Sequence, residues 1–459
     1  MYKVCNSSEN TEQTDEPPST SLLEQVCPEK CSADPDEDNL QNENRWNDWR
    51  WQIKNRIRTP GQLIRYLPNL HNNPKLTDVI KKYPLAITPY YASLIQRPDT
   101  SDPIFQMCVP QSEELLSPSC LSEDPLEEYE DMPVPGLVHR YPDRALVIVT
   151  TTCASYCRHC TRKRMAGTRE CSISTRRLQQ VTEYLLGHPE ISDVIISGGD
   201  PLTMPTDAIE TVLSSIRSVE SVQVIRIGTR VPVVLPMRIT AELVEMLRRY
   251  HPLWINTHFN HPTELTPESA DACSRLAAAG VPLGNQTVLL RGVNDSAQII
   301  EQLCRGLVRM RVRPYYLYQC DLVRGVEHFR TPLSRGIEIM EYMRGRVSGI
   351  AIPSFVVDAP HGGGKIPVMP NYIVSMSPTH TVLRNHEGLM VNYPEPEIKT
   401  SPRAQDEQVQ SVKAGVWELA SGKMSIIQPV NMTRNERRQK IVEKRKKTPV
   451  PDCGFLFDL

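Results

Sequence analysis

ALVIVTT, residues 145–151, is the first of a series of short apolar runs that alternate with amphipathic stretches of helical length. The series continues with RRLQQVTEYLLGH (176–188), DVIISGG (193–199) and IETVLSSIRS (209–218), and it ends with PYYLYQC (314–320). This alternation predicts parallel strands joined by crossover helices. About six such units are too few for a complete eight-unit barrel. The sequence therefore predicts an α/β fold built on a partial (β/α)6 barrel of the TIM type, with a doubly wound sheet as the alternative.

Polar residues gather where these predicted strands end. The motifs are SGGD (197–200), GTR (228–230), THFNHP (257–262) and QCD (319–321). In both architectures the ligand site lies at the carboxyl ends of the strands. We therefore expect these four motifs to share one site.

Composition divides the rest of the chain. The first residues are polar and acidic with few large apolar side chains, which predicts disorder. Strand signals recur in FVVDA, YIVSM and TVLRN near the carboxyl end, with HGGGK after the first, and Arg434–Lys447 is a charged run expected to form a solvated helix. The predicted segments are a disordered arm (1–44), a helical region with a Pro-rich connection (45–135), the barrel (136–353), a small β-containing appendage (354–395) and a polar tail (396–459).

Charge and hydropathy exclude some classes of function. The formal net charge is −2 and the isoelectric point is near 6.6, so there is no overall basic field for nucleic acid. No run approaches the ~20 apolar residues of a membrane span, and the amino end has no signal-peptide pattern. We expect a cytoplasmic protein whose 13 cysteines serve metal or redox chemistry rather than disulfides.

CASYCRHC, residues 153–160, places Cys153, Cys157 and Cys160 in a loop directly after the first strand of the series. Three thiolates leave a four-iron cluster one protein ligand short, and the fourth iron is then open to an exogenous ligand. A zinc site completed by His159, or three free thiols, are the alternatives. The spacing favours an iron–sulfur cluster.

At these residues the chain resembles the radical S-adenosylmethionine superfamily, which has this cysteine spacing with an aromatic residue, here Tyr156, before the second cysteine. SGGDPL (197–202) resembles the superfamily's glycine-rich motif. The resemblance implies that Gly198, Gly199 and Asp200 contact S-adenosylmethionine on a [4Fe-4S] cluster.

PHGGGK (360–365) ends in a lysine after three glycines and lacks the spacing of a P-loop. Alone it would be an exposed turn or a Schiff-base lysine for pyridoxal phosphate. From Trp46 to about Pro396, however, the chain is similar to lysine 2,3-aminomutase and its close relatives. The resemblance is carried by NDWRWQIKNRI, RYPDR, CASYCRHCTRKR, SGGDPL, THFNHP, LLRGVND, YYLYQCD, EHFRTPL and VVDAPHGGGKIPVMPNYIVS.

This second resemblance implies pyridoxal 5′-phosphate bound through Lys365, with Arg144 on its phosphate and Arg140 nearby. The same resemblance implies that Arg162 binds the substrate carboxylate and that His258 and Gln286 line the S-adenosylmethionine pocket. Asp321 and Asp358 would bind the side-chain ammonium of lysine. Two carboxylates attract a cation and repel an acidic substrate such as glutamate.

The implied reaction is a 1,2-amino migration that converts L-lysine to L-β-lysine. The implied partners are the free amino acid, an electron donor of the flavodoxin or ferredoxin type, and further copies of the chain in a homo-oligomer. An aminomutase for arginine or another basic amino acid, and a non-enzymatic iron–sulfur regulator, are the alternatives. The chain departs from the family at its zinc cysteines, since it has Ser296 and TSPRAQDEQ instead, so we expect no zinc.

Overall fold

The computed structural model describes residues 45–395, except for 69, 71–74, 117, 168 and 378, and then 419, 421–424, 426–427 and 432–447. These residues belong to one compact unit that begins at Arg45. The predicted arm, residues 1–44, and most of the predicted tail lie outside the described residues.

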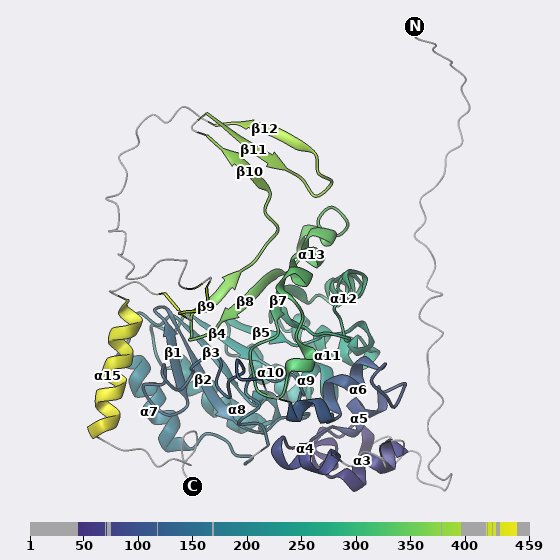
Figure 1. Ribbon diagram of the computed structural model, residues 1–459. Coiled ribbons are helices and arrows are strands. Elements are labelled where there is room, and N and C mark those ends of the chain that lie inside the picture. Colours follow the sequence, from purple (N-terminus) through teal and green to yellow (C-terminus); the bar gives the residue numbers. More distant parts are fainter. Residues whose placement is uncertain are drawn as a thin grey trace, which may run out of the picture. The chain divides into compact units, whose positions relative to one another are not determined.

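A curved sheet of nine strands forms the centre of this unit, and its strands follow one another in chain order (Figure 1). The strands are β1 (Leu137–Tyr141), β2 (Arg144–Thr150), β3 (Asp193–Gly198), β4 (Val224–Gly228), β5 (Leu253–Thr257), β6 (Leu283–Leu289), β7 (Arg313–Gln319), β8 (Ser354–Ala359) and β9 (Gly364–Pro367). β2 to β8 are parallel, whereas β1 and β9 pair antiparallel at the two edges. The predicted α/β partial barrel is confirmed, and β2 to β7 are its six expected strands.

The sequence FVVDA forms β8 and extends the barrel sheet, whereas the prediction placed it in the appendage. β8 pairs in parallel with β7, and its Phe355 and Val356 are buried. An apolar run of this kind is typical of a parallel strand covered on both faces. β9 then folds back on β8 so that Asp358 lies opposite Lys365. Both residues are therefore at the edge of the barrel sheet.

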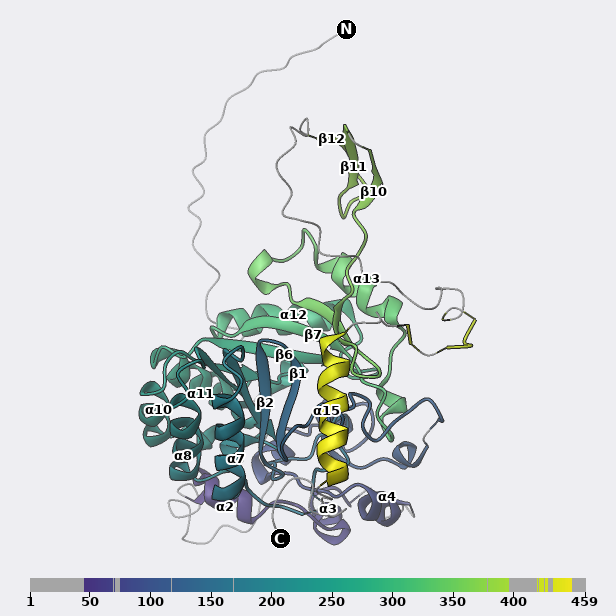
Figure 2. The ribbon, with the colours of Figure 1, turned by 90° about the vertical axis from the view of Figure 1, so that its left-hand side faces the viewer.

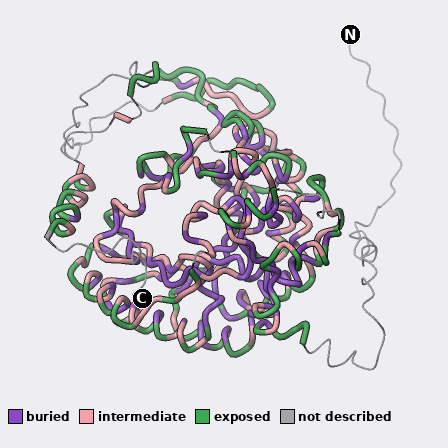
Figure 3. The backbone as a smooth tube through the Cα atoms, turned by 60° about the horizontal axis from the view of Figure 1, so that its bottom comes forward, coloured by how far each residue is buried: buried purple, intermediate pink, exposed green. Residues whose placement is uncertain are grey.

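Helices, most of them amphipathic, pack around the sheet. They are α7 (Thr175–Leu186), α8 (Thr206–Arg217), α9 (Val231–Val234), α10 (Ala241–Arg248), α11 (Pro267–Ala278), α12 (Ala297–Arg309) and α13 (Leu333–Met343). In α7, for example, Leu178, Val181 and Leu185 are buried, at the spacing of one helix face. Buried residues accordingly gather in the interior, and exposed residues lie along the outer sides of the helices (Figure 3).

Among the residues described before the barrel, five short helices form the helical region that the sequence predicts. They are α2 (Trp49–Lys54), α3 (Pro60–Tyr66), α4 (Leu76–Lys82), α5 (Pro89–Ser93) and α6 (Pro103–Cys108). The side chains of Asp48, Thr59, Thr88 and Asp102 cap four of them. This region contacts the cysteine loop, because the Tyr156 amide donates to the Ala86 carbonyl and the Arg158 amide to that of Met107.

Two elements follow the barrel. β10 (Ile373–Met376), β11 (His380–Arg384) and β12 (Met390–Pro394) form a separate antiparallel sheet, and α15 (Thr433–Lys447) lies beside β1 (Figure 2). The predicted helix in the charged run exists, but ion pairs rather than solvent engage one of its faces, since Arg434 and Arg438 pair with Asp131. No helix in the described part of the chain is long and apolar enough to cross a membrane.

Candidate active site

A cavity of about 490 Å³ lies at the carboxyl ends of the parallel strands. The four motifs expected to share a site all contribute to it. The predicted site residues that line it are Arg144, Cys153, Cys157, Cys160, Arg162, Gly198, Gly199, Asp200, His258, Gln286, Asp321, Asp358 and Lys365. Arg140 is not among the lining residues, and its guanidinium lies 3.1 Å from Asp131.

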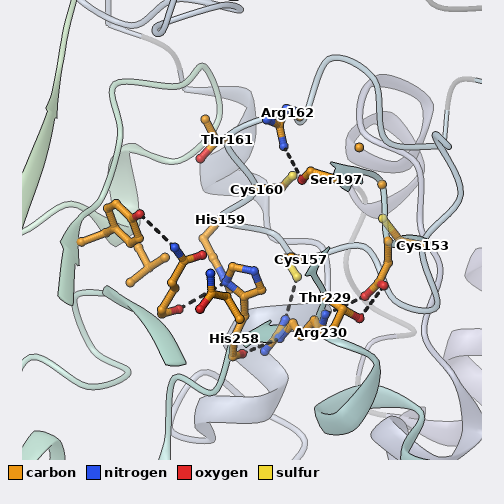
Figure 4. Close-up of a pocket in the computed structure, with 18 of the residues that line it drawn as sticks. Cys153, Cys157, His159, Cys160, Thr161, Arg162, Ser197, Thr229, Arg230 and His258 are labelled. Carbon is orange, nitrogen blue, oxygen red and sulfur yellow. Dashed lines mark hydrogen bonds between the residues drawn. The ribbon is translucent and has the colours of Figure 1, made fainter. Parts of the chain in front are cut away.

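The three cysteines of the loop after β2 face this cavity (Figure 4). Burial raises the pKa of the Cys153 thiol well above its usual range and that of Cys160 to about 11. No three His, Cys, Asp or Glu side chains in the described ranges lie close enough to share one metal ion. A four-iron cluster has different demands, since each thiolate binds a separate iron. Three thiols on one cavity wall fit it.

Arg230 follows β4 and belongs to the GTR motif that we expected in the site, but the sequence assigned this arginine no role. Its Nη1 lies 2.7 Å from the Cys157 Sγ, and its Nη2 lies 2.6 Å from Glu264. The Tyr91 hydroxyl and the His258 carbonyl accept further hydrogen bonds from the same guanidinium. This buried arginine places a fixed positive charge against Cys157, a predicted cluster ligand.

A second buried network holds the cysteine loop in place. Glu114 is inaccessible to solvent, and its carboxylate lies 2.6 Å from Arg158 and 2.5 Å from Lys163. Burial lowers the pKa of Lys163 to about 8. Arg158 also donates to the carbonyls of Tyr83 and Pro84. The loop is thus tied to the Pro-rich connection and to the amino-terminal helices.

The glycines of SGGD permit close contact between two backbones. A Cβ on Gly198 would lie 2.3 Å from the Thr150 carbonyl oxygen, and one on Gly199 would lie 2.3 Å from that of Thr152. From the sequence we expect these glycines to let a ligand approach the backbone. In the structure they let β3 pack against the residues that lead into the cysteine loop. Only glycine fits such contacts.

Asp200 is also used structurally. Its carboxylate accepts hydrogen bonds of 2.6 Å from both the Thr229 hydroxyl and the Arg230 amide. Burial raises the pKa of Asp200. The carboxylate therefore joins the ends of β3 and β4 beneath the cavity, while its predicted role toward S-adenosylmethionine stays a prediction.

Arg162 is held by Glu128, a partner that the sequence argument also missed. The two side chains approach to 2.7 Å, and Arg162 Nη1 lies 3.3 Å from the Ser197 hydroxyl. Burial alone would raise the pKa of Glu128, but Arg162 and Arg164 hold it at about 2. The guanidinium is thereby fixed in the cavity wall.

His258 directly follows β5, and Gln286 lies on the adjacent strand β6. The His258 ring lies 3.3 Å from the Gln286 carbonyl, and the Gln286 side-chain amide donates to the Tyr318 hydroxyl at 3.2 Å. Burial and the charge of Arg230 lower the pKa of His258 to about 4. Its imidazole is therefore neutral at physiological pH.

Lys365 and the two aspartates meet at another part of the cavity. Lys365 Nζ lies 2.8 Å from Asp358 Oδ2 and 5.2 Å from the centre of the Tyr318 ring. Asp358 Oδ1 is buried and has no hydrogen-bond partner within the described residues. Asp321 accepts a 2.5 Å hydrogen bond from Thr161, and burial raises its pKa to about 6. This corner of the cavity has unused capacity to accept hydrogen bonds from a cation.

The residues around Lys365 also fit a phosphorylated aromatic cofactor. Arg144 lies 4.4 Å above the Tyr141 ring, and its Nε forms an ion pair of 3.4 Å with Asp143. The Tyr141 hydroxyl accepts a hydrogen bond from the Lys365 amide. Tyr315 and Tyr316 add aromatic surface to the same wall. A guanidinium that lines the cavity suits a phosphate, and the tyrosines suit a planar ring.

The loop that carries Lys365 is braced by α15. The Arg434 guanidinium donates to the carbonyls of His361 and Gly362, and it lies 2.8 Å from Asp131. Glu127 pairs with both His361 and Arg438. These contacts connect α15, the HGGGK loop and the segment that supplies Glu128.

Comparisons with known proteins agree with this geometry. A family model described as "Radical SAM superfamily" matches residues 147–303, and one described as "Lysine-2,3-aminomutase" matches residues 340–452. An L-lysine 2,3-aminomutase from Clostridium subterminale is 49% identical over 85% of this chain and 95% of its own length. The chain belongs to the lysine 2,3-aminomutase family. Another family member, an L-lysine 2,3-aminomutase from Fusobacterium nucleatum, is 48% identical over 88% of this chain and 96% of its own length.

A more distant member of the lysine 2,3-aminomutase family is a glutamate 2,3-aminomutase from Clostridioides difficile, 43% identical over 75% of this chain and 82% of its own length. Membership confirms the predicted isomerase, and it implies a [4Fe-4S] cluster, S-adenosylmethionine and pyridoxal phosphate. Two positions correspond to the family's zinc cysteines. The first, Ser296, directly precedes α12, and the second, in TSPRAQDEQ, lies outside the described residues.

Proposed function

We propose that this enzyme converts free L-lysine to L-β-lysine by moving the amino group from C2 to C3. The observation that carries the proposal is a cavity whose lining includes the fixed cation Arg162 and, beside Lys365, the carboxylates Asp321 and Asp358, of which Asp358 has a buried oxygen without a hydrogen-bond partner among the described residues. An amino acid with a cationic side chain matches this charge pattern. The relatives named L-lysine 2,3-aminomutase support the same substrate.

The carboxylates favour a basic substrate over an acidic one. Lys365 already places an ammonium group 2.8 Å from Asp358, so this position accepts the same chemical group that ends a lysine side chain. A glutamate carboxylate would meet two like charges in a largely buried place. Asp321 and Asp358 would therefore select the substrate, and Arg162 would bind its carboxylate in bidentate fashion.

The cofactors would be held by residues that surround the substrate. Cys153, Cys157 and Cys160 would bind the cluster, Lys365 would bind pyridoxal phosphate, and Arg144 would bind its phosphate. When bound, the cluster with S-adenosylmethionine supplies a carbon-centred radical, and pyridoxal phosphate supplies the conjugated system that lets nitrogen migrate. The chain's own contribution is to orient the substrate at both ends and to exclude water from the space between.

The cofactor assignment can be tested without turnover. Loading the protein with pyridoxal phosphate should give a visible absorption band that borohydride removes, and Lys365→Ala should lack the band. Lys365→Arg is the matched control, because it keeps the charge near Asp358 but cannot form a Schiff base. A band that persists in both variants would contradict the role of Lys365.

A second candidate is an aminomutase for arginine or another basic amino acid, since two carboxylates would bind any such side chain. Anaerobic turnover of lysine, arginine, ornithine and glutamate, with dithionite as reductant, separates the two. The proposal predicts the highest kcat/KM for lysine and little turnover of glutamate. A preference for arginine would favour the second candidate.

Other parts of the proposal concern partners and compartment. The reaction needs a one-electron donor, for which we propose a carrier of the flavodoxin or ferredoxin type.

The small sheet β10 to β12 supports a homo-oligomer, which light scattering can test, because it exposes the apolar side chains Ile373, Val374, Met376, Met390 and Tyr393. The cysteines that the structure describes are all free thiols, which supports a reducing cytoplasm.

A further inference from the structure

A second cavity, of about 370 Å³, lies on the outer side of the cysteine loop. It is lined by Arg58, Ile80, Pro84, Leu85, Tyr156, Gly167, Arg169 and Glu170. Tyr156 lines this outer cavity and the active-site cavity as well. Since Tyr156 directly precedes Cys157, one side chain separates the outer cavity from the space that the cysteines face.

A chain of polar contacts also connects the cysteine loop with this outer surface. The Cys153 carbonyl accepts a 2.5 Å hydrogen bond from Arg56, and Arg56 lies 2.9 Å from Glu170. Glu170 in turn lies 2.6 Å from Arg58, whose side chain is 45% exposed. Three short contacts therefore lead from a proposed cluster ligand to a solvent-exposed cation.

The surface around the outer cavity is strongly basic. Residues 45–85 contain nine Lys and Arg residues but only two acidic ones, which gives a net charge of +7 in a chain whose formal net charge is −2. Arg58 and Arg169 line the outer cavity, Lys81 and Lys82 follow its lining residue Ile80, and all four are exposed. We call these four residues the basic face. The nearby Glu170 is already neutralised by Arg56 and Arg58.

We infer that the basic face docks an acidic one-electron carrier protein that reduces the cluster. This inference rests on the proposed function, because only a cluster in the cysteine loop gives the electron a destination. One electron would leave the carrier and enter the cluster, without transfer of atoms. The thin wall at Tyr156 keeps the distance short, and the basic face supplies the complementary charge.

Electrostatics predicts how such docking would behave. Opposite charges on two proteins raise the rate of encounter by about 10-fold to 10³-fold at low salt, and this gain falls steeply with ionic strength. A small anion such as dithionite does not need the extended face. The basic face should therefore govern reduction by a protein and leave reduction by dithionite nearly unchanged.

The experiment uses the full-length protein with its cluster and S-adenosylmethionine, and a flavodoxin hydroquinone as the probe. Lys81→Glu, Lys82→Glu and Arg169→Glu are combined, and Arg58 is kept because it pairs with Glu170. Stopped-flow absorbance measures the rate of cluster reduction. At low ionic strength the triple variant should be reduced at least about tenfold more slowly than the parent, and added salt should remove the difference.

A matched control reverses three exposed arginines on or near α12 and α13, far along the barrel from α3 and α4 (Figure 1): Arg305, Arg335 and Arg346. This control should be reduced by flavodoxin at the parent's rate. Reduction of the basic-face variant at the parent's rate, or equal slowing of the control, would overturn the inference. Equal slowing of the basic-face variant with dithionite would overturn it too, since it would indicate damage to the cluster site.

Failure of the inference and failure of the proposed function give different results. If the parent protein turns over lysine with dithionite but the basic-face variant shows no defect with flavodoxin, only the docking surface is wrong. If the parent does not turn over any basic amino acid with dithionite, the proposed function itself is wrong.

Discussion

Asp321→Asn should stabilise the protein without its cofactors, although it removes a residue that we assign to substrate binding. The Asp321 carboxylate is buried, and burial raises its pKa from 3.8 to about 6. Ionising it at neutral pH therefore costs about 3 kcal/mol of folding free energy, because a tenfold change in an equilibrium constant corresponds to about 1.4 kcal/mol. An asparagine oxygen can still accept the hydrogen bond from Thr161, so the substitution removes the cost of the charge and keeps the contact.

The sign of the pH dependence follows from the raised pKa. The folded protein holds the Asp321 proton more tightly than the unfolded chain does, so stability is lost as the pH rises towards 6, and the full cost applies above that value. The advantage of Asp321→Asn should be about 3 kcal/mol at pH 7.5 and about half of that at pH 5. Urea unfolding under anaerobic conditions measures both values.

The matched variant is Asp358→Asn, for which we expect the opposite sign. It would leave Lys365 Nζ without its carboxylate partner at 2.8 Å. Because the Lys365 side chain is partly exposed, the loss should be less than about 1 kcal/mol. The reasoning is refuted if Asp321→Asn is no more stable than the parent at pH 7.5, or if its advantage is the same at both pH values.

Three further predictions concern the supports of the site. Glu114→Gln should lower the free energy of unfolding by about 3–5 kcal/mol in urea titrations, because it leaves Arg158 and a neighbouring buried lysine unpaired; an unchanged midpoint would contradict this. Arg434→Ala should weaken pyridoxal phosphate binding about tenfold in absorbance titrations, since it frees the HGGGK loop, whereas the exposed Lys440→Ala should not. The KM for lysine should rise as the pH falls through about 6, where Asp321 takes up a proton, and a flat KM between pH 5 and 8 would argue against its role.

The parts of the site that sequence predicts best are those carried by local pattern. Strand ends in a parallel sheet converge at one edge, so SGGD, GTR, THFNHP and QCD could be brought together from periodicity alone. The spacing of the three cysteines is likewise local. The roles of Lys365 and Arg144 came from the family resemblance instead, because a glycine-rich turn and a surface arginine have no distinctive pattern.

What the sequence did not predict depends on contacts between distant segments. Glu114, Glu128 and Asp131 lie in a Pro-rich stretch that reads as a simple connection, yet all three are buried against cations. The sequence did contain one indication of buried carboxylates. The cationic residues that follow the third cysteine, Cys160, need carboxylate partners if they are buried. Nothing in local sequence shows that α15 supplies Arg434 to Asp131 across 303 positions.

Arg140 shows that residues close in sequence can have different roles. It stands four positions before Arg144 in RYPDR, and proximity in sequence suggested that both would bind the phosphate. In the structure Arg140 pairs with Asp131, whereas Arg144 lines the cavity. We therefore leave Arg140 out of the proposed phosphate site.

The most direct test of the proposed reaction follows the nitrogen itself. Anaerobically reconstituted protein with dithionite, S-adenosylmethionine and pyridoxal phosphate is given L-lysine labelled with ¹⁵N at the α-amino group, and the product is examined by NMR. The cavity geometry predicts β-lysine with the label on C3, and loss of this product in Asp358→Asn. Lysine recovered unchanged, while another amino acid is converted under the same conditions, would contradict it.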